Sequence, residues 1–331
     1  MALSTDTATA TEFRPEDLEQ YRRELTGYCY RMLGSAFEAE DAVQETMIRA
    51  WRAGDSFEGR SAVRSWVYRI ATNVCLDMLR GRQRRATPMD LGPAGKADSF
   101  TGAQRPEHAW VTPIPDGKVL PEAADPAAVA EAKETIRLAF ITALQNLPAR
   151  QRAVLILREV LRWQASEVAE LLDTSVASVN SALQRARAAL AARHGGDSEG
   201  PPAPASVDAE QQALLSRYVD AFERYDIESL VALLHEDAVM SMPPYDFWLT
   251  GPGQMGRWFV GEGIGCKGSR LVATTANGSA AFGSYRPDPA GGHYPWALQV
   301  IEISGERIVG HHNFLDTDLF AAFGLPAHLD G

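Results

Sequence analysis

Two short helical patterns separated by a turn, at residues 163–193, constrain the fold of this 331-residue chain more than any other stretch. In the first pattern, Val168, Leu171 and Leu172 recur at the spacing of one helix face. The sequence Asp-Thr-Ser at 173–175 interrupts it, and such side chains bond nearby backbone and favour turns and helix N-caps. The apolar positions of the second pattern are again three and four residues apart: Val176, Val179, Leu183, Ala186 and Leu190. The stretch therefore predicts a helix-turn-helix.

The other side of the second helix carries only hydrogen-bonding and basic side chains: Ser178, Asn180, Ser181, Gln184, Arg185 and Arg187. No acidic residue occurs between Val176 and Arg193, whereas an ordinary surface helix mixes Glu with Arg. Asn and Gln can pair with adenine edges, and Arg with guanine or phosphate, in a major groove that admits a helix. This side of the helix predicts DNA binding. The alternative interpretation is a solvated helix hairpin in an all-α protein.

The formal net charge of −11 is distributed unevenly along the chain. Residues 207–331 hold 16 acidic and 7 basic residues, a balance of −9. Residues 60–85, in contrast, hold seven arginines and one acidic residue, Asp77. A nucleic-acid-binding surface concentrates positive charge in this way. The alternative is a solvated helix end at 81–85, with arginines near the negative end of the helix dipole.

Composition narrows the class of protein. The chain is 45% hydrophobic, and its length suggests two or three domains. No apolar run approaches a membrane span, and the N-terminus lacks a basic start followed by an apolar block, so we expect a soluble, cytoplasmic protein. Cys29, Cys75 and Cys266 are far apart and show no CxxC spacing. Neither a zinc site nor a disulfide framework is therefore expected. No cofactor is expected either.

Residues 17–85 predict a compact helical region with helices at about 18–33, 38–52 and 63–79. Gly34-Ser35 and a loop at 54–61 separate these helices. The second helix begins with acidic residues, which its dipole favours. Five of its residues are expected to be buried: Ala42, Val43, Met47, Ile48 and Trp51.

Two ordered stretches carry a resemblance to a known family. EAEDAVQETMIRAW at 38–51, followed by SWVYRIATNVCLDMLRGRQRR at 65–85, resembles region 2 of the sigma-70 family. LPARQRAVLILREVLRWQASEVAELLDTSVASVNSALQRARAAL at 147–190 resembles region 4 of the same family. The regions that larger sigma factors add are absent, which indicates the extracytoplasmic-function (ECF, group IV) members. The resemblance implies a non-catalytic initiation factor that binds core RNA polymerase, at its clamp helices and flap, and promoter DNA. No catalytic residue and no metal ligand is expected.

The resemblance also implies roles for individual residues. Asp41, Gln44 and Glu45 match positions that dock on the polymerase clamp helices, and the acids around them make a poor DNA surface. The third helix and the turn after it would recognise the promoter −10 element as separated single strand, which repays part of the cost of unstacking a base. The matching residues there are Arg69, Asn73, Arg80, Arg82, Arg84 and Arg85. The second helix of the helix-turn-helix would enter the −35 major groove. Because Asn180-Ser181-Ala182 departs from the more basic run of many members, their −35 sequences are not transferred to this chain.

A long connector at 86–130 separates the two regions and is rich in Pro, Gly, Ala and Asp. Its first part has the composition of a disordered linker. The segment at 108–121 differs, because prolines hold an aromatic and several aliphatic residues extended. Its candidate docking residues are Trp110, Pro113, Pro115 and Asp116. The alternatives are a loosely packed loop, docking in the polymerase RNA channel, and docking on the C-terminal domain of the same chain.

After a second linker at 196–206, residues 207–326 predict two helices followed by strands. This part resembles the SnoaL-like branch of the NTF2-like superfamily, which implies an α+β cone around a pocket. Candidate pocket residues are Met242, Tyr245, Asp246, Trp248, Trp258, His293 and Trp296. Asp246 is a candidate acid in this set. Core aromatic residues and a structural histidine are the alternatives, since the sequence brings no acid–base pair within hydrogen-bond reach.

The predicted architecture is multidomain. It comprises all-α region 2 at 14–85, the linker at 86–130, all-α region 4 at 131–195, the linker at 196–206 and the α+β cone at 207–326. We expect a promoter-specific initiation factor whose acidic C-terminal domain modulates it, by docking on the rest of the chain or by sensing a small ligand. The alternative is a DNA-binding fusion whose cone is a small-molecule isomerase, cyclase or hydrolase. The sequence indicates neither the sign of the modulation nor an anti-sigma partner.

Overall fold

The computed structural model describes residues 15–54, 62–121, 125–193 and 209–330. The chain forms two compact units that interleave in sequence. The first unit comprises Met1–Leu33, Phe37–Arg82 and Leu147–Leu190. The second comprises Gly34–Ala36, Gln83–Asn146 and Ala191–Gly331. The predicted linker at 196–206 and the loop at 55–61 lie outside the described residues.

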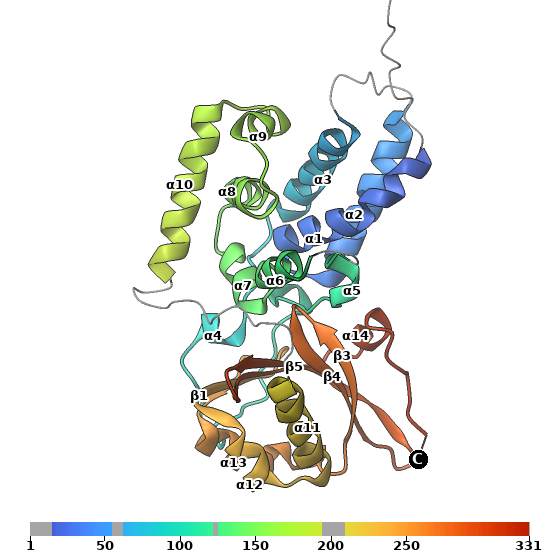
Figure 1. Ribbon diagram of the computed structural model, residues 1–331. Coiled ribbons are helices and arrows are strands. Elements are labelled where there is room, and N and C mark those ends of the chain that lie inside the picture. The colour runs from blue at the N-terminus through green and yellow to red at the C-terminus, as the bar shows by residue number, and fades with distance from the viewer. Residues whose placement is uncertain (1–14, 55–61, 122–124, 194–208, 331) are drawn as a thin grey trace, which may run out of the picture. The chain divides into compact units, whose positions relative to one another are not determined.

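The N-terminal part of the first unit is helical, as the sequence predicts (Figure 1). A 3-10 turn, η1 (Pro15–Tyr21), leads into α1 (Arg22–Leu33), and α2 (Ala36–Ala53) and α3 (Val63–Leu79) follow. Leu25, Tyr28 and Met32 on α1 are fully buried. The hydroxyl groups of Tyr28 and Thr72 hydrogen bond at 2.7 Å, which joins α1 to α3 without leaving a polar group unsatisfied.

The C-terminal part of the first unit contains the predicted helix-turn-helix. Helix α8 (Ala149–Leu155) continues through a π-helical turn, η4 (Ile156–Val160), to α9 (Ala165–Leu171) and α10 (Val176–Arg193). A capping box begins α9, in which Gln164 N donates to Glu167 Oε2 at 2.6 Å. Asp173 adopts a left-handed conformation (φ 48°) in the turn, which Asp tolerates better than most residues. Ser175 then begins α10, because its Oγ accepts from Ser178 N at 3.1 Å.

The second unit is built on one six-stranded sheet. The strands are β1 (Leu234–Ser241), β2 (Trp248–Thr250), β3 (Arg270–Ala276), β4 (Ser279–Pro287), β5 (His293–Ser304) and β6 (Arg307–Phe314). Their order is β2-β1-β6-β5-β4-β3, with β1 parallel to β6 and every other pair antiparallel. Helices preceding a bent, mostly antiparallel sheet give the α+β class predicted from the sequence.

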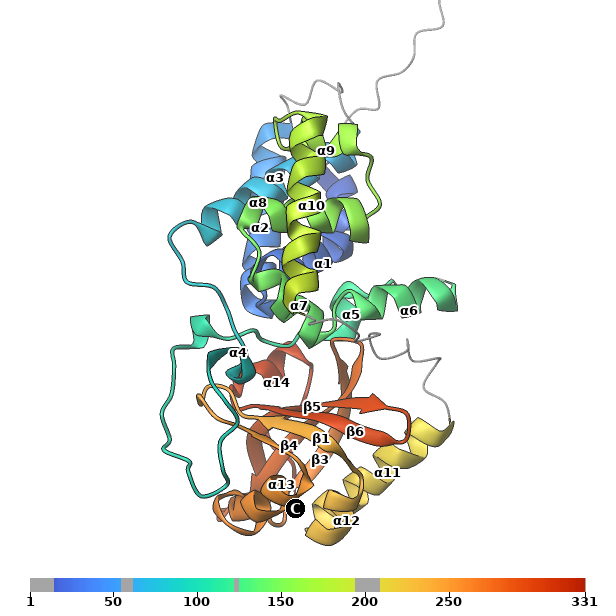
Figure 2. The same ribbon diagram turned by 90° about the vertical axis from the view of Figure 1, so that its left-hand side faces the viewer.

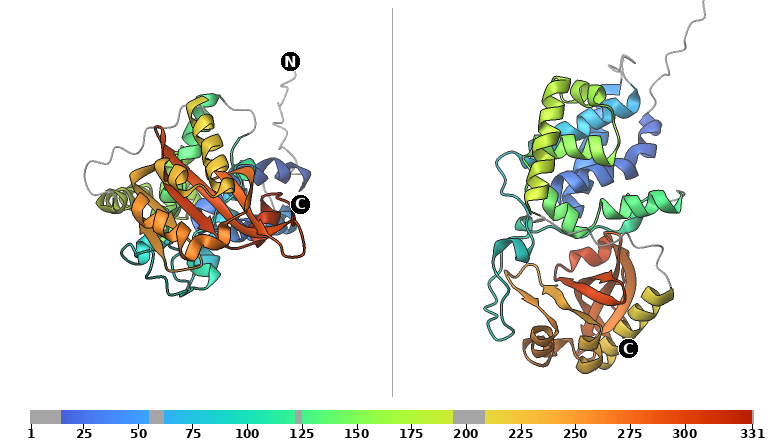
Figure 3. Two further views of the ribbon diagram at one scale, coloured as in Figure 1. Left: turned by 90° about the horizontal axis from the view of Figure 1, so that it is seen from below. Right: turned by 60° about the vertical axis from the view of Figure 1, so that its left-hand side comes forward.

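Helices cover both faces of this sheet. On one face, below the sheet in Figure 1 and nearer the viewer in the left view of Figure 3, lie α11 (Ala209–Arg224), α12 (Ile227–Ala232) and α13 (Pro252–Val260). The main apolar core lies there and includes Tyr218, Phe222 and Trp258. The other side carries short helices of the connector and α7. These helices are α4 (Pro88–Leu91), α5 (Asp116–Val119), α6 (Pro126–Glu134) and α7 (Leu138–Gln145), and α14 (Asp318–Ala322) follows the sheet.

The connector does not behave as its composition predicts. Figure 2 shows the segment after α4 as a loop beside the sheet, and backbone hydrogen bonds fix it there. Gly95 N donates to Trp248 O at 2.8 Å, and Arg105 N donates to Pro244 O at 3.0 Å. The prediction of a disordered linker is therefore wrong for this segment, because specific backbone contacts replace the apolar periodicity that it lacks. Among the described residues, no helix is long and apolar enough to cross a bilayer.

Candidate nucleic-acid interface, linker contacts and pockets

The predicted DNA-reading side of α10 faces solvent. All six polar residues proposed from the sequence are exposed: Ser178, Asn180, Ser181, Gln184, Arg185 and Arg187. The opposite side, with Val179, Leu183 and Ala186, is buried in the first unit. Arg187 Nε donates to Glu159 Oε1 at 2.9 Å, so this arginine has an intramolecular partner. Helix α10 thus exposes hydrogen-bonding and basic groups along one side.

The predicted −10 residues are not equivalent in the structure. Asn73, Arg80, Arg82 and Arg84 are exposed, whereas Arg69 is half-buried. Arg80 and Arg82 pair with acidic residues of the same unit, Asp77 and Glu38. The Nη2 atom of Arg69 lies 3.7 Å from Glu170 Oε1 on α9. The polar side of α3 therefore meets the first helix of the helix-turn-helix within the first unit.

Arg85 corrects the sequence-based assignment. Its side chain is only 8% exposed, and its Nη1 donates to the Trp110 carbonyl at 2.6 Å. A guanidinium held in this way is not available to a phosphate. Arg85 belongs to the contact that anchors the connector. The sequence gave no sign of this, because Arg85 directly follows the exposed residues of the basic segment at 81–85.

Helix α2 exposes apolar residues that were expected in the core. Trp51 is 64% exposed and Ile48 is 43% exposed, so the prediction that they are buried is wrong. Ala42 and Val43 are buried as expected, and Met47 is half-buried. Asp41 and Gln44 are also exposed. Together with Ile48 and Trp51 they recur every three or four residues along one side of the helix. This side combines acidic, amide and apolar groups, which is typical of a protein-binding surface.

The Trp/Pro segment of the connector docks on the sheet of the same unit. Trp110 is 2% exposed and Ile114 is fully buried. Ile114 N donates to Asn277 Oδ1 at 2.9 Å, and Asn277 N donates back to the Ile114 carbonyl at 3.2 Å. The side-chain amide of Asn277 also donates to Ile136 O at 2.5 Å, at the start of α7. One turn between β3 and β4 therefore holds both the connector and the segment that leads into α7.

The remaining docking candidates agree with this arrangement. Pro113 is buried, and Pro115 forms a bridge with Ala276. Asp116 Oδ1 accepts from Gly278 N at 2.7 Å. Burial raises the pKa of the Asp116 carboxyl group, although this hydrogen bond opposes the shift. Of the alternatives left open by the sequence, docking on the C-terminal domain is the one found in this structure.

The concave side of the cone encloses a cavity of about 190 Å³. Four predicted residues line it, namely Met242, Tyr245, Trp258 and Trp296. Three do not: Asp246 pairs with Arg105 at 2.7 Å, Trp248 Nε1 donates to Gly92 O at 2.9 Å, and His293 lies at the start of β5. Sequence reasoning missed twelve further lining residues, which are Phe100, Phe222, Met240, Phe259, Glu262, Gly263, Cys266, Arg286, Gln299, His311, Asn313 and Leu315.

A buried hydrogen-bonded chain closes one end of this cavity. Tyr218 Oη donates to Gln299 Oε1 at 2.7 Å and lies 2.8 Å from His311 Nε2. Asn313 Nδ2 lies 3.2 Å from His311 Nδ1 and can donate to it. Burial, with a smaller contribution from His312, lowers the pKa of His311 to about 3, so the imidazole is neutral at neutral pH. With Nε2 protonated, every polar atom of Tyr218 and His311 is used within the chain.

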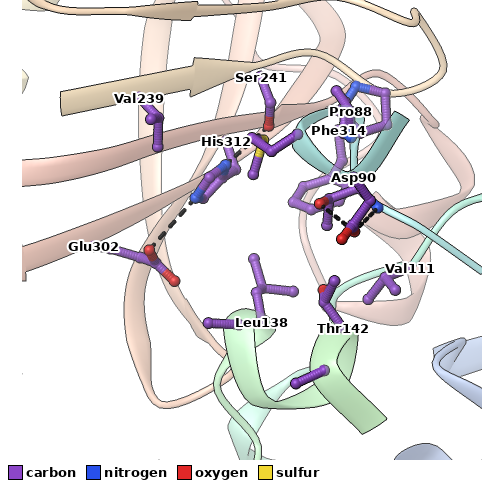
Figure 4. Close-up of a pocket in the computed structure, with 15 residues that line it drawn as sticks. Pro88, Asp90, Val111, Leu138, Thr142, Val239, Ser241, Glu302, His312 and Phe314 are labelled. Carbon is purple, nitrogen blue, oxygen red and sulfur yellow. Dashed lines mark hydrogen bonds and ion pairs between the residues drawn. The ribbon is translucent and has the colours of Figure 1, made fainter. Parts of the chain in front are cut away.

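A second cavity, of about 270 Å³, lies on the opposite face of the sheet, where α4 and α7 pack (Figure 4). His312 lies at its inner wall, with Ser241 Oγ 2.8 Å from Nδ1 and Glu302 Oε2 3.5 Å from Nε2. Burial raises the pKa of Glu302, but the hydrogen bond and charge of His312 outweigh it and the net shift is downward. Leu138 and Thr142 of α7 line the same cavity.

The remaining chemically reactive groups of the described residues are metal-ligating side chains and thiols. No group of three or more His, Cys, Asp or Glu side chains is arranged there to hold a metal ion. Cys29 and Cys75 are buried and Cys266 is half-buried, all as free thiols.

Comparisons with known proteins agree with the geometry. Models of Sigma-70 region 2 and Sigma-70 region 4 match residues 18–85 and 137–190. ECF RNA polymerase sigma factor SigG of Mycobacterium tuberculosis (strain H37Rv) is 44% identical over 320 residues, which cover 94% of this chain and 83% of that protein. ECF RNA polymerase sigma factor SigW of Bacillus subtilis (strain 168) is 33% identical over 170 residues, 51% of this chain and 82% of that protein.

The fold has a counterpart along most of the chain. The crystal structure of the Mycobacterium tuberculosis extracytoplasmic function sigma factor SigJ matches with a TM-score of 0.58 at 22% identity, covering 95% of this chain and 100% of that chain. The predicted combination of helical sigma regions and an α+β domain is confirmed.

Proposed function

The chain belongs to the family of ECF RNA polymerase sigma factors, and from this premise we propose that it directs core RNA polymerase to specific promoters in the cytoplasm. In this proposal α10 reads the −35 element as duplex and α3 binds the −10 element as separated strand. One observation carries the proposal: α10 of a helix-turn-helix exposes six polar or basic side chains, without an acidic residue among its positions. Such a helix suits the major groove, where Asn, Gln and Arg read base edges.

Core polymerase would bind the exposed side of α2. Asp41 and Gln44 offer exposed charged and amide groups there, and Ile48 and Trp51 add exposed apolar surface. Glu45 is half-buried and pairs with Arg49 at 2.6 Å. Burying an exposed Trp on a partner is favourable at about 25 cal/mol per Å² of apolar area. Trp is also enriched among the residues that dominate binding energies.

The cone would modulate initiation through the connector. The connector at 86–130 lies between α3 and the helices of region 4 in sequence, and the turn at Asn277 and Gly278 binds it at Ile114 and Asp116. Docking on the cone restricts the conformations of the connector. It therefore restricts the distances that α3 and α10 can adopt when they bind the −10 and −35 elements. The net negative charge of residues 207–331 repels DNA when the cone approaches it.

The cone is proposed as a regulatory domain and not as an enzyme. Asp246, the candidate acid, is ion-paired with Arg105 outside the cavity. His293 Nε2 bonds the Gly268 carbonyl at 3.1 Å. His311 does line the cavity, but its low pKa makes it a poor general base or acid at neutral pH.

Run-off transcription with purified core polymerase and a promoter library, randomised in both elements, tests the main proposal. We expect the chain to select templates with two constrained blocks, one near −35 and one near −10. If the library yields no transcripts beyond those of core polymerase alone, the proposal is wrong.

A chain ending near Gly196 tests the role of the cone. The same selected promoter is transcribed by full-length and shortened chains over a range of salt concentrations. We expect the two yields to differ, and the direction of the difference gives the sign of the modulation. Indistinguishable yields across the salt series would eliminate the regulatory role.

A further inference from the structure

Phe100 brings the connector into the cavity of the cone. This half-buried ring lines the cavity of about 190 Å³ and lies 4.9 Å from the Tyr245 ring and 5.1 Å from the Trp258 ring, both edge-on. Edge-to-face contacts at these centroid distances are favourable beyond the area that they bury. The connector, which joins the two promoter-binding regions in sequence, therefore supplies one wall of a cavity in another domain.

The backbone on either side of Phe100 is fixed to the rim of the cone. Ala97 N donates to Gln254 Oε1 at 3.0 Å, on α13. On the other side, Arg105 pairs with Asp246, and Asp246 N donates to Ala103 O at 3.1 Å. Glycine at position 95 allows this close approach, because a Cβ there would come within 2.9 Å of the Phe247 ring. Several independent contacts thus hold the segment at 92–105 against the cone, with Phe100 lining the cavity.

The remaining walls define the ligand chemistry. Phe222, Phe259 and Trp258 present flat aromatic surface. At the polar end, Gln299 uses its carbonyl oxygen to accept from Tyr218, so its amide N–H groups remain as donors. His311 is neutral there, and a neutral polar end accommodates an uncharged oxygen such as a carbonyl or hydroxyl group.

Arg286 supplies a positive charge to the same cavity. Its guanidinium lies 3.3 Å from the centre of the Trp296 ring, and its Nη2 donates to Cys266 Sγ at 3.3 Å. Its Nε is buried and has no hydrogen-bond partner among the described residues. Glu262, which also lines the cavity, is exposed, so water screens its carboxylate. A guanidinium that lines the cavity and is stacked on an aromatic ring is suited to a carboxylate.

We propose that the cone binds a planar aromatic acid in the cavity that Phe100 lines, with the carboxylate on Arg286 and the ring against the cavity side of Trp258, Phe259 and Phe100. The cavity exists with Phe100 in place, and an apolar cavity of about 150 Å³ already accommodates benzene. The ligand gains a wall and loses water when Phe100 is docked, so it binds the docked connector more tightly. By linkage, the ligand stabilises the docked connector.

The probe is 2-naphthoate, titrated by calorimetry into the full-length chain without polymerase or DNA. Two comparison compounds separate the contributions: 2-acetylnaphthalene lacks the charge, and decahydro-2-naphthoate lacks the aromatic ring. We expect one site for 2-naphthoate and binding of both other compounds to be weaker by about tenfold or more. Absence of saturable binding, or equal binding of all three, contradicts the proposal.

Variants locate the site. Phe100→Ala should weaken 2-naphthoate binding by about tenfold, because one aromatic wall is lost. Arg286→Gln should weaken 2-naphthoate binding and leave 2-acetylnaphthalene binding unchanged. Phe323→Ala, at a half-buried Phe of the same unit outside the cavity, is the matched control and should have no effect. If Phe100→Ala binds 2-naphthoate as tightly as the wild type, or more tightly, the connector is not part of the site.

Cleavage at Phe100 tests the coupling directly. Chymotrypsin cuts after an accessible Phe, and mass spectrometry quantifies the Phe100–Thr101 break separately from other cuts. We expect 2-naphthoate to slow this cleavage in the wild type and not in Arg286→Gln. Unchanged or faster cleavage at saturating ligand would overturn the coupling. The inference rests on the proposed function only for its effect on transcription, since none of these measurements contains polymerase or promoter DNA.

Discussion

At the scale of single residues, His311 makes the stability of the cone depend on pH. Its pKa is lowered from 6.5 to about 3 in the folded protein, mainly by burial, so the unfolded chain takes up a proton first as the pH falls. The stabilising effect of the neutral imidazole is therefore complete above about pH 6.5 and is lost progressively as the pH falls toward 3. Each unit by which the pH falls within this window lowers the free energy of unfolding by about 1.4 kcal/mol.

The comparison of wild type with His311→Gln measures this effect. In urea titrations at pH 7 and pH 5, the folded fraction is measured by pulse labelling of β5 and β6 peptides. The labelling pH is the same in both titrations. We expect the free energy of unfolding of the wild type to fall by about 2 kcal/mol more than that of the variant. Equal losses in the two proteins would show that His311 is not the titrating group.

Two residues of α10 carry the prediction for the −35 element. Asn180→Ala or Gln184→Ala removes a base-reading amide from an exposed helix side, which should cost about 1 to 3 kcal/mol at one promoter position. Binding is measured by fluorescence anisotropy with matched and altered −35 duplexes at fixed salt. The control is Gln212→Ala, an exposed amide on α11. Equal binding of matched and altered duplexes by the wild type would remove the assignment.

Side-chain roles were predictable only where local sequence decides exposure. The polar side of α10 follows from its spacing, and the structure exposes every one of its six predicted residues. Arg85 was misassigned because its partner, the Trp110 carbonyl, lies 25 residues away in sequence. The roles of Asp246 and Phe100 were unpredictable for the same reason, since each contacts partners that are 141 or more residues away in sequence. Periodicity contains no information about such contacts.

At the scale of secondary-structure elements, α2 is the surface whose role can be measured separately. Trp51→Ala removes a ring that is 64% exposed, so the fold should tolerate it, while the affinity for core polymerase should fall by about 1 to 3 kcal/mol. Competition with a labelled sigma factor for core polymerase gives the affinity. Val260→Ala, at an equally exposed apolar residue of α13, serves as the control. An unchanged affinity for Trp51→Ala would place the polymerase-binding surface elsewhere.

Helices were predicted well because their signals are local. The three N-terminal helices and both helices of the helix-turn-helix appear where apolar spacing, caps and breakers indicated them. Exposure of Ile48 and Trp51 was missed for a physical reason. An apolar residue that binds a partner has the same spacing as one that fills a core. The segment at 92–105 was missed for the opposite reason, since Gly, Pro and Asp can dock through backbone hydrogen bonds without any apolar period.

At the scale of the whole molecule, the family and the class of each domain were predictable, whereas the attachment of the connector was left open. The two sigma-like stretches and the split of charge along the chain gave the initiation factor and its acidic C-terminal part. Docking of the connector on that part depends on the turn at Asn277, 163 residues from Ile114. Asn277 adopts a left-handed conformation (φ 54°), which directs its amide toward two backbone segments.

The central claim is that the cone acts on initiation through the docked connector, and Asn277→Gly tests it most directly. Glycine keeps the left-handed turn but removes the side-chain hydrogen bonds to Ile114 and Ile136, which weakens docking by about 2 to 3 kcal/mol. The measurement is the yield of run-off transcript from a selected promoter, with wild type and variant at equal occupancy of core polymerase. We predict a clear difference in yield, in the same direction as the difference caused by removing the cone. An identical yield, with hydrogen exchange showing residues 110–116 released in the variant, would contradict the account.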